Sequence, residues 1–176
     1  RSFATTTVTA EDDRRIRTRE TEDVSLGRGT DFGQLVHDLF EQAIQGYLPE
    51  NLERYVTVRV EREEQDPENA GHALGALDRL RHSDLWKEIQ ASKHRYTEVD
   101  FARCDALLGQ SEIVRGRIDL VYRVLGGWKI VDFKTDRASS SSEKETLRKH
   151  YADQVHAYTR YWTELSGERV KGAGLW

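Results

Sequence analysis

The sequence of 176 residues contains no methionine, a single cysteine and no apolar run long enough to cross a membrane. Because even position 1 lacks methionine, we expect the chain to be a piece of a longer translation product. Cys104 cannot form an internal disulfide, and the first ten residues lack the apolar core of a secretory signal. These absences argue against a disulfide-stapled secreted domain and a transmembrane protein, and we expect a cytoplasmic location.

An excess of positive charge is missing as well. The chain has 27 Lys and Arg against 31 Asp and Glu, a formal net charge of -4, so any nucleic-acid site must be a local patch. The remaining composition, 37% hydrophobic and 33% charged residues, is ordinary for a globular protein. A chain of this length is expected to form one compact core.

The hydrophobic periodicity predicts an arm followed by a single domain. Residues 1–28 are polar and lack apolar periodicity, so we expect a linker or arm that is partly disordered. The domain is expected to cover residues 29–176, with its last strand cut short by the chain end. Residues 55–60 fit either a helix or a strand. Helices are predicted at about 31–47, 69–81, from 84 onward and 143–165, and strands at about 95–102, 113–125, 128–134 and 170–176.

This order of elements predicts an α/β fold of the mixed α+β type. Three consecutive β-rich runs favour an antiparallel meander within a central mixed sheet, and the helical segments before and after it are expected to flank that sheet. The expected core order is αβββαβ.

Two strands of the meander carry charged residues in strongly β-forming surroundings. A turn at residues 126–127 would place Asp119 opposite Lys134. Because side chains alternate between the faces of a strand, Asp119, Asp132 and Lys134 are expected on one face. Two carboxylates so close together could hold Mg²⁺ or Mn²⁺ and its bound water, while the lysine stabilises charge on a phosphorane.

The same residues have a simpler interpretation. An Asp opposite a Lys on an antiparallel sheet is often a solvated cross-strand ion pair. Asp is disfavoured in strands, yet it interrupts β-forming runs twice, at Asp119 and Asp132, on one predicted face. The second aspartate favours a functional cause.

Segments at residues 29–41, 116–119, 131–135 and 153–158 resemble motifs of the PD-(D/E)XK nuclease superfamily. The resemblance is to the RecB-like branch, which forms the C-terminal nuclease domains of UvrD-type helicases and AddA proteins. It implies a restriction-endonuclease-like core and a DNA nuclease. The Pro-Asp that names the superfamily is absent, since Ile118 precedes Asp119; the RecB-like branch commonly tolerates this departure.

The resemblance also implies roles for individual residues. Residues 29–41 are similar to the first motif, whose histidine on the opening helix binds metal, and His37 is that histidine. It implies His37, Asp119 and Asp132 as metal ligands and Asp119, Asp132 and Lys134 as catalytic residues. Taken alone, a histidine on a helix is more often structural.

Three further positions match the family less specifically. Gln154 and Tyr158 are similar to a Gln-x-x-x-Tyr motif that is implied to bind substrate, although their spacing also suits plain helix packing. Glu98 matches a further acidic position of this branch.

The resemblance implies Mg²⁺ or Mn²⁺ as the cofactor and DNA as the substrate. In the leading hypothesis the DNA is single-stranded, and the enzyme acts in DNA repair and recombination. An iron–sulfur cluster, which some relatives hold with four cysteines, is not expected in a chain with one. No Walker A motif occurs, so a helicase motor would lie in another part of the protein or in a partner. The alternative hypotheses are a catalytically inactive, nuclease-like DNA-binding module and a docking module of a helicase complex.

Overall fold

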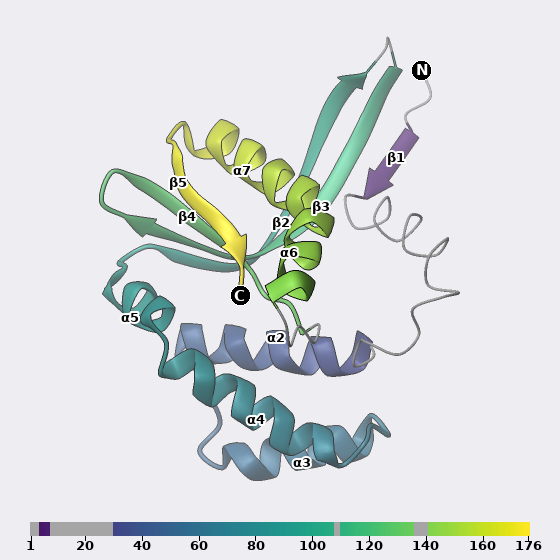
Figure 1. Ribbon diagram of the computed structural model, residues 1–176, viewed down its shortest axis with the longest axis vertical. Helices are drawn as coiled ribbons and strands as arrows, with labels where there is room; N and C mark the ends of the chain where they lie inside the picture. The colour runs from purple at the N-terminus through teal and green to yellow at the C-terminus, as the bar shows by residue number, and fades with distance from the viewer. Residues whose placement is uncertain (1–3, 8–29, 108–109, 136–140) are drawn as a thin grey trace.

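The computed structural model describes residues 4–7, 30–107, 110–135 and 141–176. A mixed five-stranded sheet runs through the molecule, with α6 and α7 against it and α2 to α5 gathered at its other side (Figure 1). The strands are β1 (Ala4–Thr7), β2 (Arg95–Leu107), β3 (Gln110–Val124), β4 (Gly127–Asp132) and β5 (Val170–Leu175). The helices are α2 (Thr30–Gln45), α3 (Leu52–Arg62), α4 (Glu68–Arg81), α5 (Asp84–Ala91), α6 (Ser141–His150) and α7 (Ala152–Ser166).

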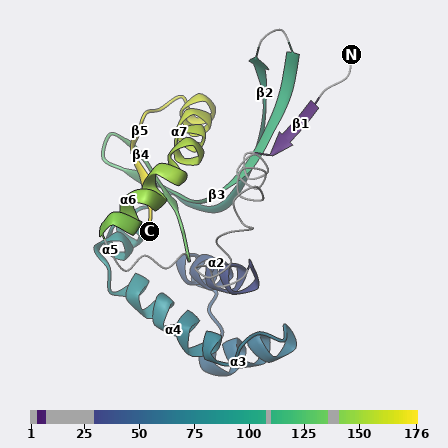
Figure 2. The same cartoon turned by 45° about the vertical axis from the view of Figure 1, so that its right-hand side comes forward.

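The sheet is organised around β3. This strand pairs antiparallel with β2 and β4, while β1 joins β3 and β5 joins β4 in parallel. The predicted fold class is therefore confirmed: a mixed sheet containing an antiparallel meander and flanked by helices. The hairpin of β2 and β3 extends away from the helices, together with β1 (Figure 2). Apart from β1, the predicted arm at residues 1–28 lies outside the described residues.

Two apolar clusters cover the two faces of the sheet. Over residues 120–122 of β3, successive side chains enter different clusters: Leu120 and Tyr122 pack with α2 to α5, whereas Val121 packs with Tyr158 and Trp162 of α7. Side chains of a strand point to opposite faces in turn, so this alternation fixes the register of the sheet.

Helix α2 forms because its apolar residues recur at helical spacing and all of them find cover. The predicted stripe is buried throughout. Its members are Phe32, Leu35, Val36, Leu39, Phe40, Ala43 and Ile44. This packing fixes the rotation of the helix, and with it the direction in which His37 projects beside the stripe.

Residues 55–60, for which helix and strand were both open, lie in helix α3. Val56 and Val60 are the buried residues of that helix and lie four positions apart, so they share one face against α4.

The predicted single helix at 143–165 is wrong, because the chain forms two helices that break at Tyr151. That residue has φ -94° and ψ 3°, outside helical geometry, and its own side chain makes no capping hydrogen bond to the start of α7. The apolar spacing continues across the break, so sequence periodicity does not reveal it.

The predicted turn of the β3–β4 hairpin is also wrong. Val124 pairs with Gly127, which leaves Leu125 and Gly126 as the turn, and Gly126 adopts the left-handed φ of +79°. Gly127 is needed inside the strand for another reason: a Cβ there would lie 2.4 Å from the carbonyl oxygen of Arg169. The true register differs by two residues, so the predicted faces are unchanged.

Candidate metal centre

Three neighbouring strands each contribute one carboxylate to the same row of the sheet. The pairs Thr97–Leu120 and Val99–Ile118 place Glu98 across from Asp119 on β3. On the other side, Leu120 pairs with Val131, and the next step of that register places Asp132 across from Asp119. Asp119, rather than facing Lys134 as the predicted turn implied, therefore lies between two other carboxylates.

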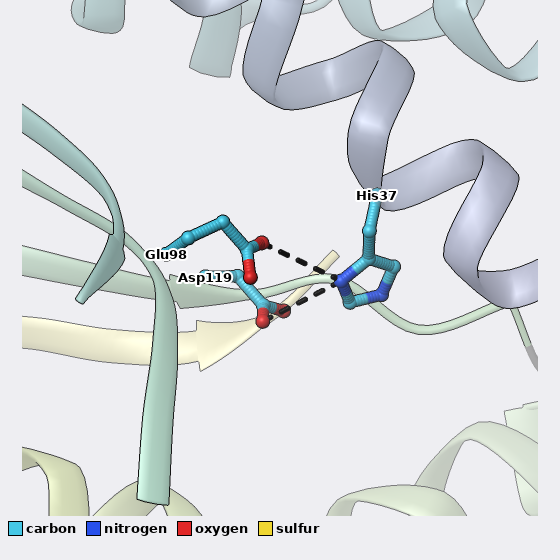
Figure 3. A group of neighbouring side chains, drawn as sticks. All are labelled: His37, Glu98 and Asp119. Carbon is cyan, nitrogen blue, oxygen red and sulfur yellow. Dashed lines mark ion pairs between the residues drawn. The ribbon is translucent and has the colours of Figure 1, made fainter. Parts of the chain in front are cut away.

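Helix α2 adds an imidazole to this row. His37 Nδ1 lies 3.5 Å from Asp119 Oδ1 and 4.0 Å from Glu98 Oε1 (Figure 3). The other ring nitrogen, Nε2, lies 2.9 Å from the carbonyl oxygen of Phe133. A carbonyl only accepts hydrogen bonds, so Nε2 is the donor, and a neutral ring then presents its Nδ1 lone pair to the carboxylates. Metal-binding histidines are commonly oriented in this way.

The ligand atoms of His37, Glu98 and Asp119 all lie within 4.8 Å of one another. Two carboxylates and one imidazole form a donor set suited to a divalent cation of the Mg²⁺ or Mn²⁺ type. Asp132 lies next to this group and is only 2% exposed. Its Oδ2 lies 3.0 Å from the Lys134 ammonium, and a buried carboxylate in this row suits a metal ligand.

The electrostatics of the row favour an added positive charge. Burial, together with the charge of Asp119, raises the pKa of Glu98 from 4.5 to about 7. Burial also raises the pKa of Asp132, and the neighbouring Lys134 offsets this rise only in part. Burial alone would lower the pKa of His37, but the neighbouring Asp119 and Glu98 carboxylates and the Phe133 carbonyl favour the protonated ring, outweigh that effect and raise it. The positive charges of His37, Arg117 and Lys134 therefore offset the cost of ionising these carboxylates only in part.

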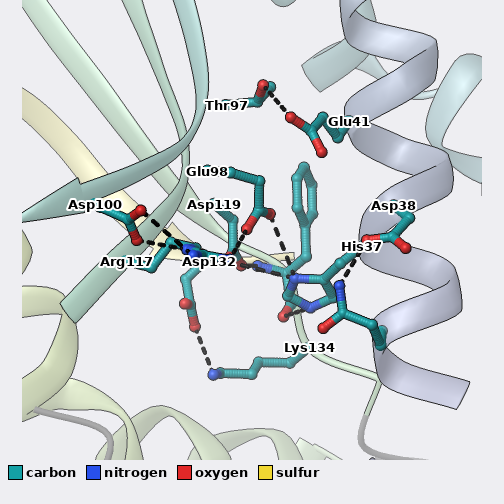
Figure 4. Close-up of polar contacts among 12 residues, drawn as sticks. His37, Asp38, Glu41, Thr97, Glu98, Asp100, Arg117, Asp119, Asp132 and Lys134 are labelled. Carbon is teal, nitrogen blue, oxygen red and sulfur yellow. Dashed lines mark hydrogen bonds and ion pairs between the residues drawn. The ribbon is translucent and has the colours of Figure 1, made fainter. Parts of the chain in front are cut away.

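Backbone geometry at Glu98 is unusual. Its φ of +50° lies in the left-handed region, which residues other than glycine rarely adopt inside a strand. Arg117 lies beside it, 2.7 Å from Asp100 and 3.5 Å from Glu98 (Figure 4). Strained conformations of this kind concentrate at functional sites.

Residues 132–134 are held in place by backbone contacts on two sides. Asp119 Oδ2 accepts a hydrogen bond of 2.6 Å from the Phe133 amide, and Lys134 and Asp132 exchange backbone hydrogen bonds with Trp176 just past β5. Lys134 Nζ then lies 3.0 Å from Asp132 Oδ2. The lysine is thus fixed at its backbone beside the carboxylate row (Figure 4).

The two residues expected to bind substrate lie on α7. Gln154 is 4% exposed and donates a hydrogen bond of 2.6 Å to the hydroxyl of Tyr158, which is buried against Phe101. The ring of Tyr158 also lies close to Gly116, at the start of the strand motif. Gln154 and Tyr158 therefore pack within the fold, as their helical spacing allowed. Their role in substrate binding stays a prediction.

Sequence reasoning missed Tyr151 and Trp176. Trp176 contacts the site through backbone hydrogen bonds to Asp132 and Lys134 and through its ring against Phe133, all distant in sequence. Tyr151, at the break between α6 and α7, places its ring 4.1 Å from Lys134 Nζ. No local pattern indicates either contact.

Comparison with known proteins identifies the class. The family model of the PD-(D/E)XK nuclease superfamily matches residues 10–176, so the chain belongs to that superfamily. The predicted membership is confirmed, and the mixed sheet with its flanking helices is consistent with the restriction-endonuclease-like fold.

The relatives it resembles are ATP-dependent helicase/nuclease subunits A. That of Acetivibrio thermocellus is 26% identical over 152 residues, which cover 79% of this chain and 12% of the relative. That of Staphylococcus epidermidis is 26% identical over 164 residues, covering 82% and 13%. That of Carboxydothermus hydrogenoformans is 44% identical over 59 residues, covering 34% and 5%. The chain thus spans at most 13% of these relatives.

Among solved structures, one titled "Crystal structure of SSO0001" is 18% identical with a TM-score of 0.32, covering 74% of this chain and 67% of that one. Within the described residues, none of the helices has the length and apolar character needed to span a membrane.

Proposed function

We propose that this chain is the nuclease domain, over residues 29–176, of a Mg²⁺- or Mn²⁺-dependent deoxyribonuclease that hydrolyses phosphodiester bonds. The observation that supports this most directly is the group formed by His37, Glu98 and Asp119, with Asp132 and Lys134 beside it. Catalytically inactive nuclease-like modules normally lose ligands, whereas this chain keeps them all.

In this proposal each residue has a distinct task. His37 and Asp119 hold the cation together with Asp132, and Glu98 is a further ligand close enough to share it. A bound divalent cation would polarise a phosphoryl oxygen and lower the pKa of a coordinated water. The carbonyl of Phe133 keeps His37 Nδ1 directed at the carboxylates.

Lys134 supplies the positive charge that the protein itself contributes to catalysis in this proposal. Its ammonium group, 3.0 Å from Asp132, lies where it can stabilise negative charge on the phosphorane and position the attacking water. Gln154 and Tyr158 are proposed to contact the DNA near Gly116.

We propose further that the substrate is single-stranded DNA delivered by a helicase motor, in the same polypeptide or in a partner, during repair and recombination. The support is that the relatives are named helicase/nuclease subunits and that this chain matches only a small part of each.

The test is cleavage of end-labelled single-stranded and duplex DNA by this chain with Mg²⁺, Mn²⁺ or EDTA. Asp119→Asn should abolish metal-dependent cleavage, and Lys134→Ala should lower it roughly 10²- to 10³-fold, to a residual rate that can still be measured. Their matched controls are Asp84→Asn, at an exposed ion pair of α5, and Lys129→Ala, on β4 but paired with Glu88; both should cleave like the wild type. A wild-type chain that neither cleaves DNA nor binds Mn²⁺ contradicts the proposal and favours a docking module.

A further inference from the structure

The break between α6 and α7 brings an aromatic ring to the predicted catalytic lysine. Tyr151 lies three positions before Gln154 and seven before Tyr158, so its spacing continues the inward stripe of α7 toward the helix start. The ring of His150 packs edge-on against it, with centroids 4.7 Å apart. Tyr151 is therefore oriented by its neighbours as well as by the backbone.

Lys134 has its ammonium group between two partners. One is Asp132 Oδ2 at 3.0 Å, and the other is the Tyr151 ring, whose centroid lies 4.1 Å from Nζ. This distance is well inside the range of a cation–π contact. The side chain of Lys134 is 21% exposed, so water does not fully screen the interaction.

A lysine needs such a second contact to be held in one direction. Its stem has four flexible carbons, and its ammonium is a point charge without the fixed geometry of a guanidinium. Its ion pair with Asp132 Oδ2 is a single contact, which restrains the distance of the ammonium from the carboxylate better than its direction. The ring face of Tyr151 supplies that second contact.

We propose that Tyr151 is a positioning residue of the site, which holds the Lys134 ammonium beside Asp132 through the face of its ring. This inference rests on the proposed function, because Lys134 must act in catalysis for its position to matter. The contact uses the ring and not the hydroxyl, so phenylalanine at this position preserves it and leucine removes it.

Two measurements on the whole chain test this role. In NMR spectra, the ε-methylene protons of Lys134, assigned by their absence in Lys134→Ala, should be shifted upfield by the ring in the wild type and in Tyr151→Phe, but not in Tyr151→Leu. In cleavage assays, Tyr151→Leu should lower kcat roughly 5- to 30-fold, the range expected for loss of a cation–π contact, with KM and Mn²⁺ affinity unchanged. Tyr151→Phe should stay within about twofold of the wild type, since the ring face remains.

Two controls separate positioning from folding. Tyr47→Leu, at an exposed tyrosine of the α2–α3 connection, should leave kcat and the lysine signals unchanged. In a Lys134→Ala background, Tyr151→Leu should cause no further loss of the residual rate, because the ring acts through the lysine.

The proposal is overturned if Tyr151→Leu cleaves at the wild-type rate, if Tyr151→Phe is as impaired as Tyr151→Leu, or if the wild type shows no upfield shift. A wild-type chain that cleaves nothing refutes the proposed function and removes any catalytic role for the ring. The NMR measurement then still decides whether the contact itself exists, so the two failures are distinguishable.

Discussion

Replacing Glu98 by glutamine should stabilise the metal-free protein while weakening its response to metal. Folding raises the pKa of Glu98 from 4.5 to about 7, mainly through burial and the charge of Asp119. The ionised form is therefore disfavoured in the folded state, and its cost is absent below pH 4.5, grows between pH 4.5 and about 7, and is complete above that.

The size of the effect follows from the same values. The rise corresponds to at most about 3 kcal/mol, and because the side chain is 21% exposed, screening reduces this to about 1–3 kcal/mol. For a chain of this length that predicts a rise in Tm of about 3–10 °C in EDTA at pH 8.

The assay is thermal unfolding of wild type and Glu98→Gln in EDTA at pH 4 and pH 8, then with excess Mn²⁺. Glu98→Gln should gain stability at pH 8 but not at pH 4, and added Mn²⁺ should stabilise the wild type more than the variant. Glu53→Gln, on the exposed side of α3, serves as control. A variant less stable than the wild type at pH 8 in EDTA would show that Glu98 is a structural ion-pair partner of Arg117, and the reasoning would be refuted.

Three further predictions address the ligand, the hairpin and the substrate. His37→Ala should weaken Mn²⁺ binding by at least about tenfold in calorimetry, because it removes a ligand and not only its orientation; unchanged affinity would exclude His37. Gly127→Ala should destabilise the fold by roughly 1–3 kcal/mol in urea, because the added Cβ meets Arg169, whereas Gly174→Ala, with open space, should not; equal effects would contradict the close approach. Gln154→Ala should raise KM for DNA more than it lowers kcat in steady-state cleavage, and an unchanged KM would leave the residue a packing role.

The local pattern of apolar residues was sufficient to predict those elements whose structure depends on burial. The stripe of α2 from Phe32 to Ile44 follows from one side facing a core, and along β3 and β4 the side chains alternate between cores on the two faces of the sheet. Side chains alternate between the faces of a strand with a period of two. A hairpin register wrong by two residues therefore still placed Asp119 and Asp132 on the correct face.

What the sequence could not reveal depends on contacts between distant segments. Gly126 and Gly127 look alike in sequence, yet one makes the turn and the other avoids a clash with Arg169. The position of Glu98 beside His37 requires both the β2–β3 register and the rotation of α2. Tyr151 contacts Lys134 from the break between α6 and α7, and apolar periodicity continues through that break.

Pulsed EPR of Mn²⁺ bound to this chain tests the metal centre most directly. The account predicts one nitrogen hyperfine coupling to the bound Mn²⁺, from His37 Nδ1, that disappears in His37→Ala and persists in the control His72→Ala on α4. Bound Mn²⁺ with no nitrogen coupling, or a coupling that survives His37→Ala, would contradict the assignment of His37, Asp119 and Asp132, with Glu98 as a further ligand, as the metal centre.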